Sequence, residues 1–94
     1  MSYKKIVEMI PVEKRGKLSD KLLNYLLKAK KENKMPSSLA KCFLSQWQTG
    51  GFDDVVGLAV LLEATVTVEP EKTIEFVETE MQLAEVAKAL KEAA

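Results

Sequence analysis

Apolar residues recur at helical spacing along most of the chain, in five separate stretches. These stretches are separated by residues that start or stop helices, such as Pro11, Gly16, Pro36 and Pro70. The pattern predicts an all-α fold, a compact bundle of four to five helices with a long C-terminal helix. The length predicts a single helical domain over residues 1–94.

The first two predicted helices meet near Pro11. Ser2 can cap a short first helix, and Pro11 ends it because the proline ring denies the preceding residue a helical conformation. One further turn is expected before Gly16. The second helix is predicted to begin at Ser19, whose hydroxyl suits an N-cap, and to stop at Asn33.

The two middle helices are predicted on each side of the paired glycines. Ser37 or Ser38 can cap the third helix, and Gly50 stands where a left-handed residue often ends one. Asp53 can cap the fourth helix, which is apolar all round and therefore expected to be buried. We expect helix over the β-branched residues 65–68 as well, with fraying near the end, although an extended segment is the alternative.

The last helix is predicted to run from Pro70 to about Glu92, roughly 35 Å at the rise of an α-helix. Polar side chains, all but one of them acidic, should line one of its faces: Glu71, Glu75, Glu78, Gln82, Glu85 and Glu92. A continuous acidic face of this kind suits contact with a basic protein, or with the basic half of the same chain.

Charge is divided between the two halves of the chain, although the net charge is zero. Residues 1–50 carry 11 basic and 4 acidic side chains, whereas residues 51–94 carry 3 and 10. Such asymmetry can indicate a nucleic-acid or protein partner. The basic residues predicted to contact nucleic acid are Lys14, Arg15, Lys17, Lys21, Lys28, Lys31 and Lys41. Only one of the 14 basic residues, Arg15, is an arginine, the side chain most used for base contacts, which counts against the nucleic-acid interpretation.

A protein partner is indicated by apolar and acidic residues together. The fourth helix has no polar stripe, so some apolar surface either lies in the core or is covered by another chain. The residues predicted to bind protein are Phe43, Trp47, Phe52, Glu71, Glu75, Glu78 and Glu85. A core role for each aromatic residue is the alternative.

The segment TGGFDD, residues 49–54, resembles a phosphate-binding loop only in its glycines. Two aspartates stand where a phosphate would sit, so the segment is better interpreted as one helix end followed by the next helix start. The chain has no histidine and one cysteine, so we expect no metal site and no cofactor. Cys42 is expected to be a buried structural thiol.

Catalysis is not expected. Glu63, a carboxylate in an apolar helix, is the one candidate general acid or base, provided that it is buried. No small-molecule substrate is evident. An alternative is a helix-turn-helix protein whose third helix presents Ser38, Lys41, Ser45 and Gln48 to DNA, although the preceding joint is longer than the usual turn.

Residues 55–68 form the longest run of low charge, and 14 residues are fewer than the roughly 20 that span a bilayer. We therefore expect no membrane partner. A single cysteine suits a reducing, cytoplasmic location. Lysine and glutamate together supply 24 of 94 residues, a tendency of thermophile proteins.

These observations predict a non-enzymatic interaction module, an accessory or adaptor subunit of a DNA- or RNA-processing assembly. Its basic half would face nucleic acid, and its acidic helix would face another protein subunit. The alternatives are a helical protein that binds nucleic acid directly and a homodimer with a structural role.

Overall fold

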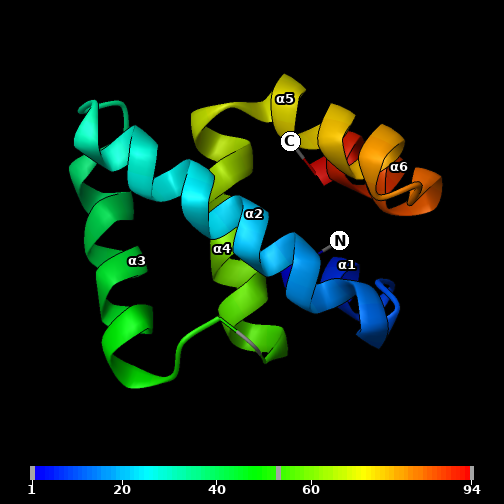
Figure 1. The fold of residues 1–94 in the computed structure, drawn as a ribbon, viewed down its shortest axis with the longest axis horizontal. Helices are drawn as coiled ribbons and strands as arrows, with labels where there is room; N and C mark the ends of the chain where they lie inside the picture. The colour runs from blue at the N-terminus through cyan, green and yellow to red at the C-terminus, as the bar shows by residue number, and fades with distance from the viewer. Residues whose placement is uncertain (1, 53, 94) are drawn as a thin grey trace.

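The computed structural model describes residues 2–52 and 54–93 and shows a compact all-α bundle (Figure 1). Its helices are α1 (Tyr3–Glu8), α2 (Val12–Lys31), α3 (Ser37–Thr49), α4 (Val55–Val68), α5 (Pro70–Glu75), the π-helical turn η1 (Phe76–Glu80) and α6 (Ala84–Ala93). The molecule measures 30 × 25 × 22 Å. The predicted all-α bundle is therefore confirmed.

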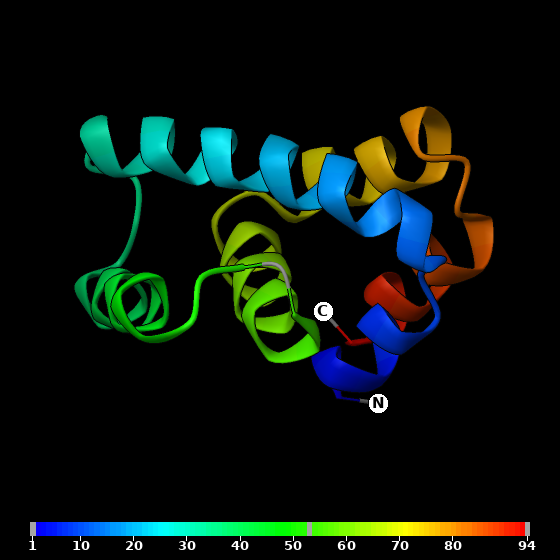
Figure 2. The same ribbon diagram turned by 60° about the horizontal axis from the view of Figure 1, so that its bottom comes forward.

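Helix α4 is the centre of the bundle. It contacts α1, α2, α3 and α5, and α2 crosses in front of it in the view of Figure 1. Turning the molecule shows α3 on one side of α4 and α1 on the other (Figure 2). A helix without a polar stripe is stable in water only when neighbours cover most of its surface. Because α4 lies at the centre, neighbouring helices bury most of its apolar side chains. The helix continues to Val68, as the sequence favours.

The N-terminal helix begins and ends where the sequence predicts. The Ser2 hydroxyl accepts a hydrogen bond from the Lys5 amide at 3.3 Å, which satisfies one of the unpaired donors of the first turn. Helix α1 ends at Glu8, shortly before Pro11. Its residues Ile6 and Val7 are fully buried and join the core.

The predicted start of the second helix at Ser19 is wrong, because α2 is continuous from Val12 to Lys31. Gly16 lies within it, and Ser19 is buried with its hydroxyl donating to the Phe52 carbonyl at 3.1 Å. The predicted stop at Asn33 is confirmed. Asn33 has a left-handed backbone with φ of 58°, and the next amide bonds back to the Ala29 carbonyl at 2.9 Å, as at many helix ends.

The joints around α3 differ from the prediction in detail. Pro36 occupies the N-cap position and no side chain caps this helix, so the predicted cap by Ser37 or Ser38 is wrong. The left-handed glycine after α3 is Gly51, with φ of 70°, whereas Gly50 has φ of −157°. The turn therefore needs a glycine, but one residue later than expected.

Asp54 caps α4, with its carboxylate accepting a hydrogen bond from the Gly57 amide at 2.6 Å. The predicted cap, Asp53, lies outside the described residues. Gly57 is the third residue of α4 and packs against the preceding loop. A Cβ there would lie 2.3 Å from the Gly51 carbonyl oxygen, so only glycine fits this approach.

The predicted long C-terminal helix is wrong. The chain leaves the α-helix at Phe76, makes the π-helical turn, and reverses at Gln82, whose φ is 57°. Helix α6 then returns along the same side of the molecule (Figure 1). Met81 and Leu83 amides bond to carbonyls five and six residues back, so the wide turn keeps its backbone donors satisfied.

One cluster of buried residues draws on α1, α2, α3, α4, η1 and α6, with Ile74 of α5 packed against it. Among residues 2–52 and 54–93, no helix has both the length and the apolar character needed to cross a bilayer.

Candidate nucleic-acid and protein interfaces

Helix α2 presents a row of exposed lysines, here called the lysine stripe: Lys17, Lys21, Lys28 and Lys31. The spacings of three and four residues, with Asn24 in the middle gap, place these residues on one face of the helix. Lys17 belongs to the row because α2 does not break at Gly16 or Ser19. The stripe is about 21 Å long at the rise of an α-helix.

Lys14 and Arg15 have partners within the chain. The Lys14 ammonium donates to the Met81 carbonyl at 3.0 Å, where the π-helical turn ends. Arg15 donates through Nε to the Ile10 carbonyl at 3.0 Å, just past the end of α1. Cations are favoured at the C-terminal ends of helices, where carbonyls lack helical partners. Both residues therefore hold the first turn of α2 against its neighbours.

The lysine stripe is not neutralised by the acidic helices through direct ion pairs. Within the part of the chain that the structure describes, ion pairs join Lys34 to Glu32 at 3.3 Å and Lys91 to Glu78 at 3.2 Å. Both pairs lie outside the stripe, and exposed pairs of this kind contribute little to stability. The stripe thus keeps its positive charge facing solvent.

The acidic residues predicted to bind protein fall into two groups. Glu71, Glu75 and Glu78 surround a shallow hollow on α5 and η1, together with Lys91 of α6. Glu85 is exposed on α6, after the chain reversal. The continuous acidic face expected along one helix is therefore wrong, but three of its members stay together.

The three predicted aromatic anchors form one cluster. The rings of Phe43 and Phe52 stack with centroids 5.1 Å apart. The Trp47 ring lies nearly perpendicular to both, with its centroid 5.8 Å from that of Phe43 and 5.9 Å from that of Phe52. Phe43 and Phe52 are 0% and 6% exposed, so they belong to the core. Trp47 is 45% exposed and Leu44 is 38% exposed, which leaves an apolar edge of α3 facing solvent.

Helix α3 is covered on one side only, with Phe43 as its one fully buried residue. Lys41, one of the residues predicted to contact nucleic acid, is exposed on α3. Cys42 is also exposed, which corrects the expectation of a buried thiol. Small and polar uncharged residues can face water, so the near absence of charge on α3 does not require its burial.

Glu63 lies exposed on α4, so it is not the buried carboxylate that general acid or base chemistry would need there. The charge of Glu63 acts on the hydroxyl of Tyr3. Burial, and secondarily the Glu63 charge, raise the pKa of Tyr3 above its usual value of 10.0. In residues 2–52 and 54–93, no three potential metal-ligating side chains come together.

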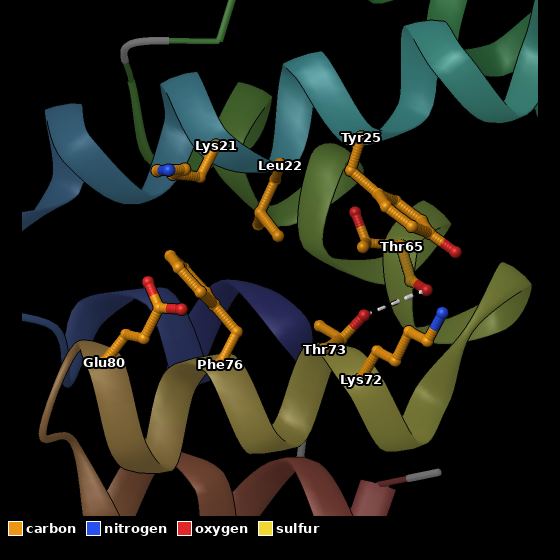
Figure 3. Close-up of a pocket in the computed structure, with 8 residues that line it drawn as sticks. All are labelled: Lys21, Leu22, Tyr25, Thr65, Lys72, Thr73, Phe76 and Glu80. Atoms are coloured by element: carbon orange, nitrogen blue, oxygen red, sulfur yellow. Dashed lines mark hydrogen bonds between the residues drawn. The ribbon is translucent and has the colours of Figure 1, made fainter.

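Lys72 lies in the acidic half of the sequence and is not among the residues predicted to contact nucleic acid. It lies on α5 and lines the same pocket as Lys21 of α2 (Figure 3). No local signal indicates this, since the two residues are far apart in sequence and only the folded chain brings them to one pocket.

No protein-family model, curated protein sequence or solved structure matches this chain.

Proposed function

We propose that the protein is a binding module, an accessory subunit of a nucleic-acid-processing assembly. On this proposal the lysine stripe of α2 lies along a phosphate backbone. The apolar edge of α3 around Trp47 and the acidic hollow formed by Glu71, Glu75 and Glu78 contact another protein.

The alignment of four exposed lysines on one uninterrupted helix carries the proposal. Each lysine that approaches a phosphate releases condensed counterions, so a row of them binds nucleic acid without reading its sequence. Lysine acts as a point charge and suits this role, whereas base-edge contacts more often use arginine, which the stripe lacks.

The separation of surfaces supports an accessory role. The stripe lies on α2, the acidic hollow lies on α5 and η1, and Trp47 lies on α3. These elements are different helices of one bundle (Figure 1). A partner protein can therefore be engaged through one surface while α2 remains open to nucleic acid.

The test of the nucleic-acid surface is fluorescence anisotropy with a labelled oligonucleotide. We expect binding at about 50 mM salt that weakens by about 50-fold or more at about 200 mM, as four phosphate contacts require. Replacing Lys17 and Lys28 by glutamine should remove most of the affinity. An absence of binding at low salt would overturn the proposal.

The protein surface is tested by cross-linking and mass spectrometry on native extracts, with the Trp47→Ala and the Glu71→Lys/Glu75→Lys variants as comparison. Loss of the same cross-linked protein in either variant, with the fold retained by circular dichroism, supports the accessory role. Nucleic-acid binding with no such protein would instead favour the direct nucleic-acid-binding alternative.

A further inference from the structure

A pocket of about 190 Å³ opens beside the lysine stripe, between α2, α4 and the segment formed by α5 and η1 (Figure 3). Lys21, Leu22 and Tyr25 line it from α2, and Lys72, Phe76 and Glu80 line it from the opposite side. Two threonines also line the pocket, but the Thr65 hydroxyl donates to the Leu61 carbonyl at 2.7 Å and the Thr73 hydroxyl donates to the Thr65 carbonyl at 3.2 Å. The polar groups free to meet a ligand are therefore those at the ends of the pocket.

The charged and aromatic side chains that line the pocket lie in a definite order along it. Figure 3 shows Lys21 and Glu80 at one end, Tyr25 and Lys72 at the other, and Leu22 and Phe76 between them. Phe76 points from η1 toward α2, and Tyr25 points from α2 toward the junction of α4 and α5. The pocket thus offers an apolar centre formed by Leu22 and Phe76, a lysine at each end, and the Glu80 carboxylate beside Lys21.

An unpaired nucleotide within a strand has the matching chemistry, because its base is a flat ring with a phosphate on either side along the chain. Pockets for drug-sized ligands span roughly 300–1,000 Å³, so about 190 Å³ suits one base rather than a larger molecule. The Glu80 carboxylate adds an acceptor that suits the exocyclic amino group of a base.

We propose that this pocket holds one unpaired base of a single-stranded nucleic acid, stacked on Phe76 and Tyr25, while the flanking phosphates lie on Lys21, Lys72 and the rest of the lysine stripe. The inference rests on the proposed function and specifies the ligand as single-stranded nucleic acid. Bases of a duplex are paired and stacked inside, so they reach such a pocket only when the strands are apart.

The experiment compares three labelled probes of about 12 nucleotides: a mixed-sequence single strand, its duplex, and an abasic strand with the same number of phosphates. The single strand should bind at least about fivefold more tightly than the abasic strand, the smallest effect expected from stacking one base. It should also bind more tightly than the duplex.

Two variants locate the effect in the pocket. Phe76→Leu keeps an apolar side chain but removes the aromatic face, so it should reduce single-strand affinity to the abasic level and leave abasic affinity unchanged. Tyr25→Leu should act likewise, whereas Tyr25→Phe, which keeps the ring, should retain most of the preference. Circular dichroism and Trp47 fluorescence report whether each variant is folded, and the Tyr25 pair decides the question should Phe76→Leu unfold.

The outcomes separate this inference from the proposed function. Equal, salt-dependent affinity for the single strand and the abasic strand would overturn the base pocket and leave phosphate binding by the stripe intact. Binding to none of the three probes at low salt would overturn both.

Discussion

The Ser19 hydroxyl donates a hydrogen bond to the Phe52 carbonyl, 3.1 Å away, and so fastens the middle of α2 to the loop before α4. Ser19 is 4% exposed, so this bond lies in the interior. The contact positions both candidate surfaces, because Phe52 stacks on Phe43 and meets Trp47. It ties the lysine stripe to the aromatic cluster of α3.

Substitution at Ser19 distinguishes this role from that of a helix cap. Ser19→Ala should lower the free energy of unfolding by about 1–3 kcal/mol, because it leaves the buried Phe52 carbonyl without this donor. Ser19→Gly should cost about 1 kcal/mol more, since glycine is unfavourable inside a helix. Urea denaturation measures both. At a cap the order would be reversed, with glycine milder than alanine.

Alanine substitution at two helical glycines, Gly57 in α4 and Gly16 in α2, tests whether the close packing of α4 requires a glycine. Gly57→Ala would place a Cβ against backbone atoms of Gly51 and Phe52, and should destabilise the protein by about 1–3 kcal/mol. Gly16 lies in α2 with open space around the added Cβ, so Gly16→Ala should raise stability by about 1 kcal/mol. Thermal unfolding should shift in opposite directions for the two variants. A rise in melting temperature for Gly57→Ala would contradict this account of the packing.

Local signals of the sequence are sufficient for the all-α class and for several helix ends. The Ser2 cap, the end of α1 before Pro11 and the left-handed Asn33 each depend on residues within a few positions. Ser19 shows the limit of this reasoning. It has the side chain of an N-cap, but its partner Phe52 lies 33 residues away, and such a bond cannot be read from spacing.

The break before α6 has no sequence signal either. Gln82 has a positive φ, yet residues 71–94 contain neither glycine nor proline to announce a turn. Met81 is 3% exposed, and its carbonyl accepts from Lys14 of α2. The sequence does not predict the pocket residues Tyr25, Lys72 and Phe76 either, because α2, α5 and η1 come to line one pocket only in the folded chain.

Lys14 should affect stability, and Lys17 should affect binding. Lys14→Gln removes the cation at the Met81 carbonyl and should lower the free energy of unfolding by about 1 kcal/mol, with little change in the salt dependence of oligonucleotide binding. Lys17 is exposed on the stripe, so Lys17→Gln should leave stability unchanged and weaken binding. Denaturation and anisotropy on both proteins check the pair. Equal effects of the two substitutions on binding would contradict the structural role of Lys14.

The two tyrosines should titrate above their usual range in the folded protein. Burial, then the Glu63 charge, raises the pKa of Tyr3, and burial, then the Glu69 charge, raises the pKa of Tyr25. Because the folded pKa values exceed the unfolded value of 10.0, the tyrosine contribution to stability is complete below pH 10.0 and is lost as pH rises through the folded values.

Tyrosinate absorbance measures this directly, since the chain has only two tyrosines. The midpoint should lie above pH 10.0 in the folded protein and near pH 10.0 in denaturant. The Tyr3→Phe and Tyr25→Phe variants assign the two residues. Identical midpoints for the folded and denatured protein would contradict the burial of these side chains.

The salt dependence of oligonucleotide binding tests the role of the lysine stripe most directly. For contacts from Lys17, Lys21, Lys28 and Lys31 to a single strand, the plot of log K against log salt should have a slope of about −3. The Lys17→Gln/Lys28→Gln variant should halve it to about −1.5. A slope unchanged by these substitutions, or no binding at low salt, would contradict the account.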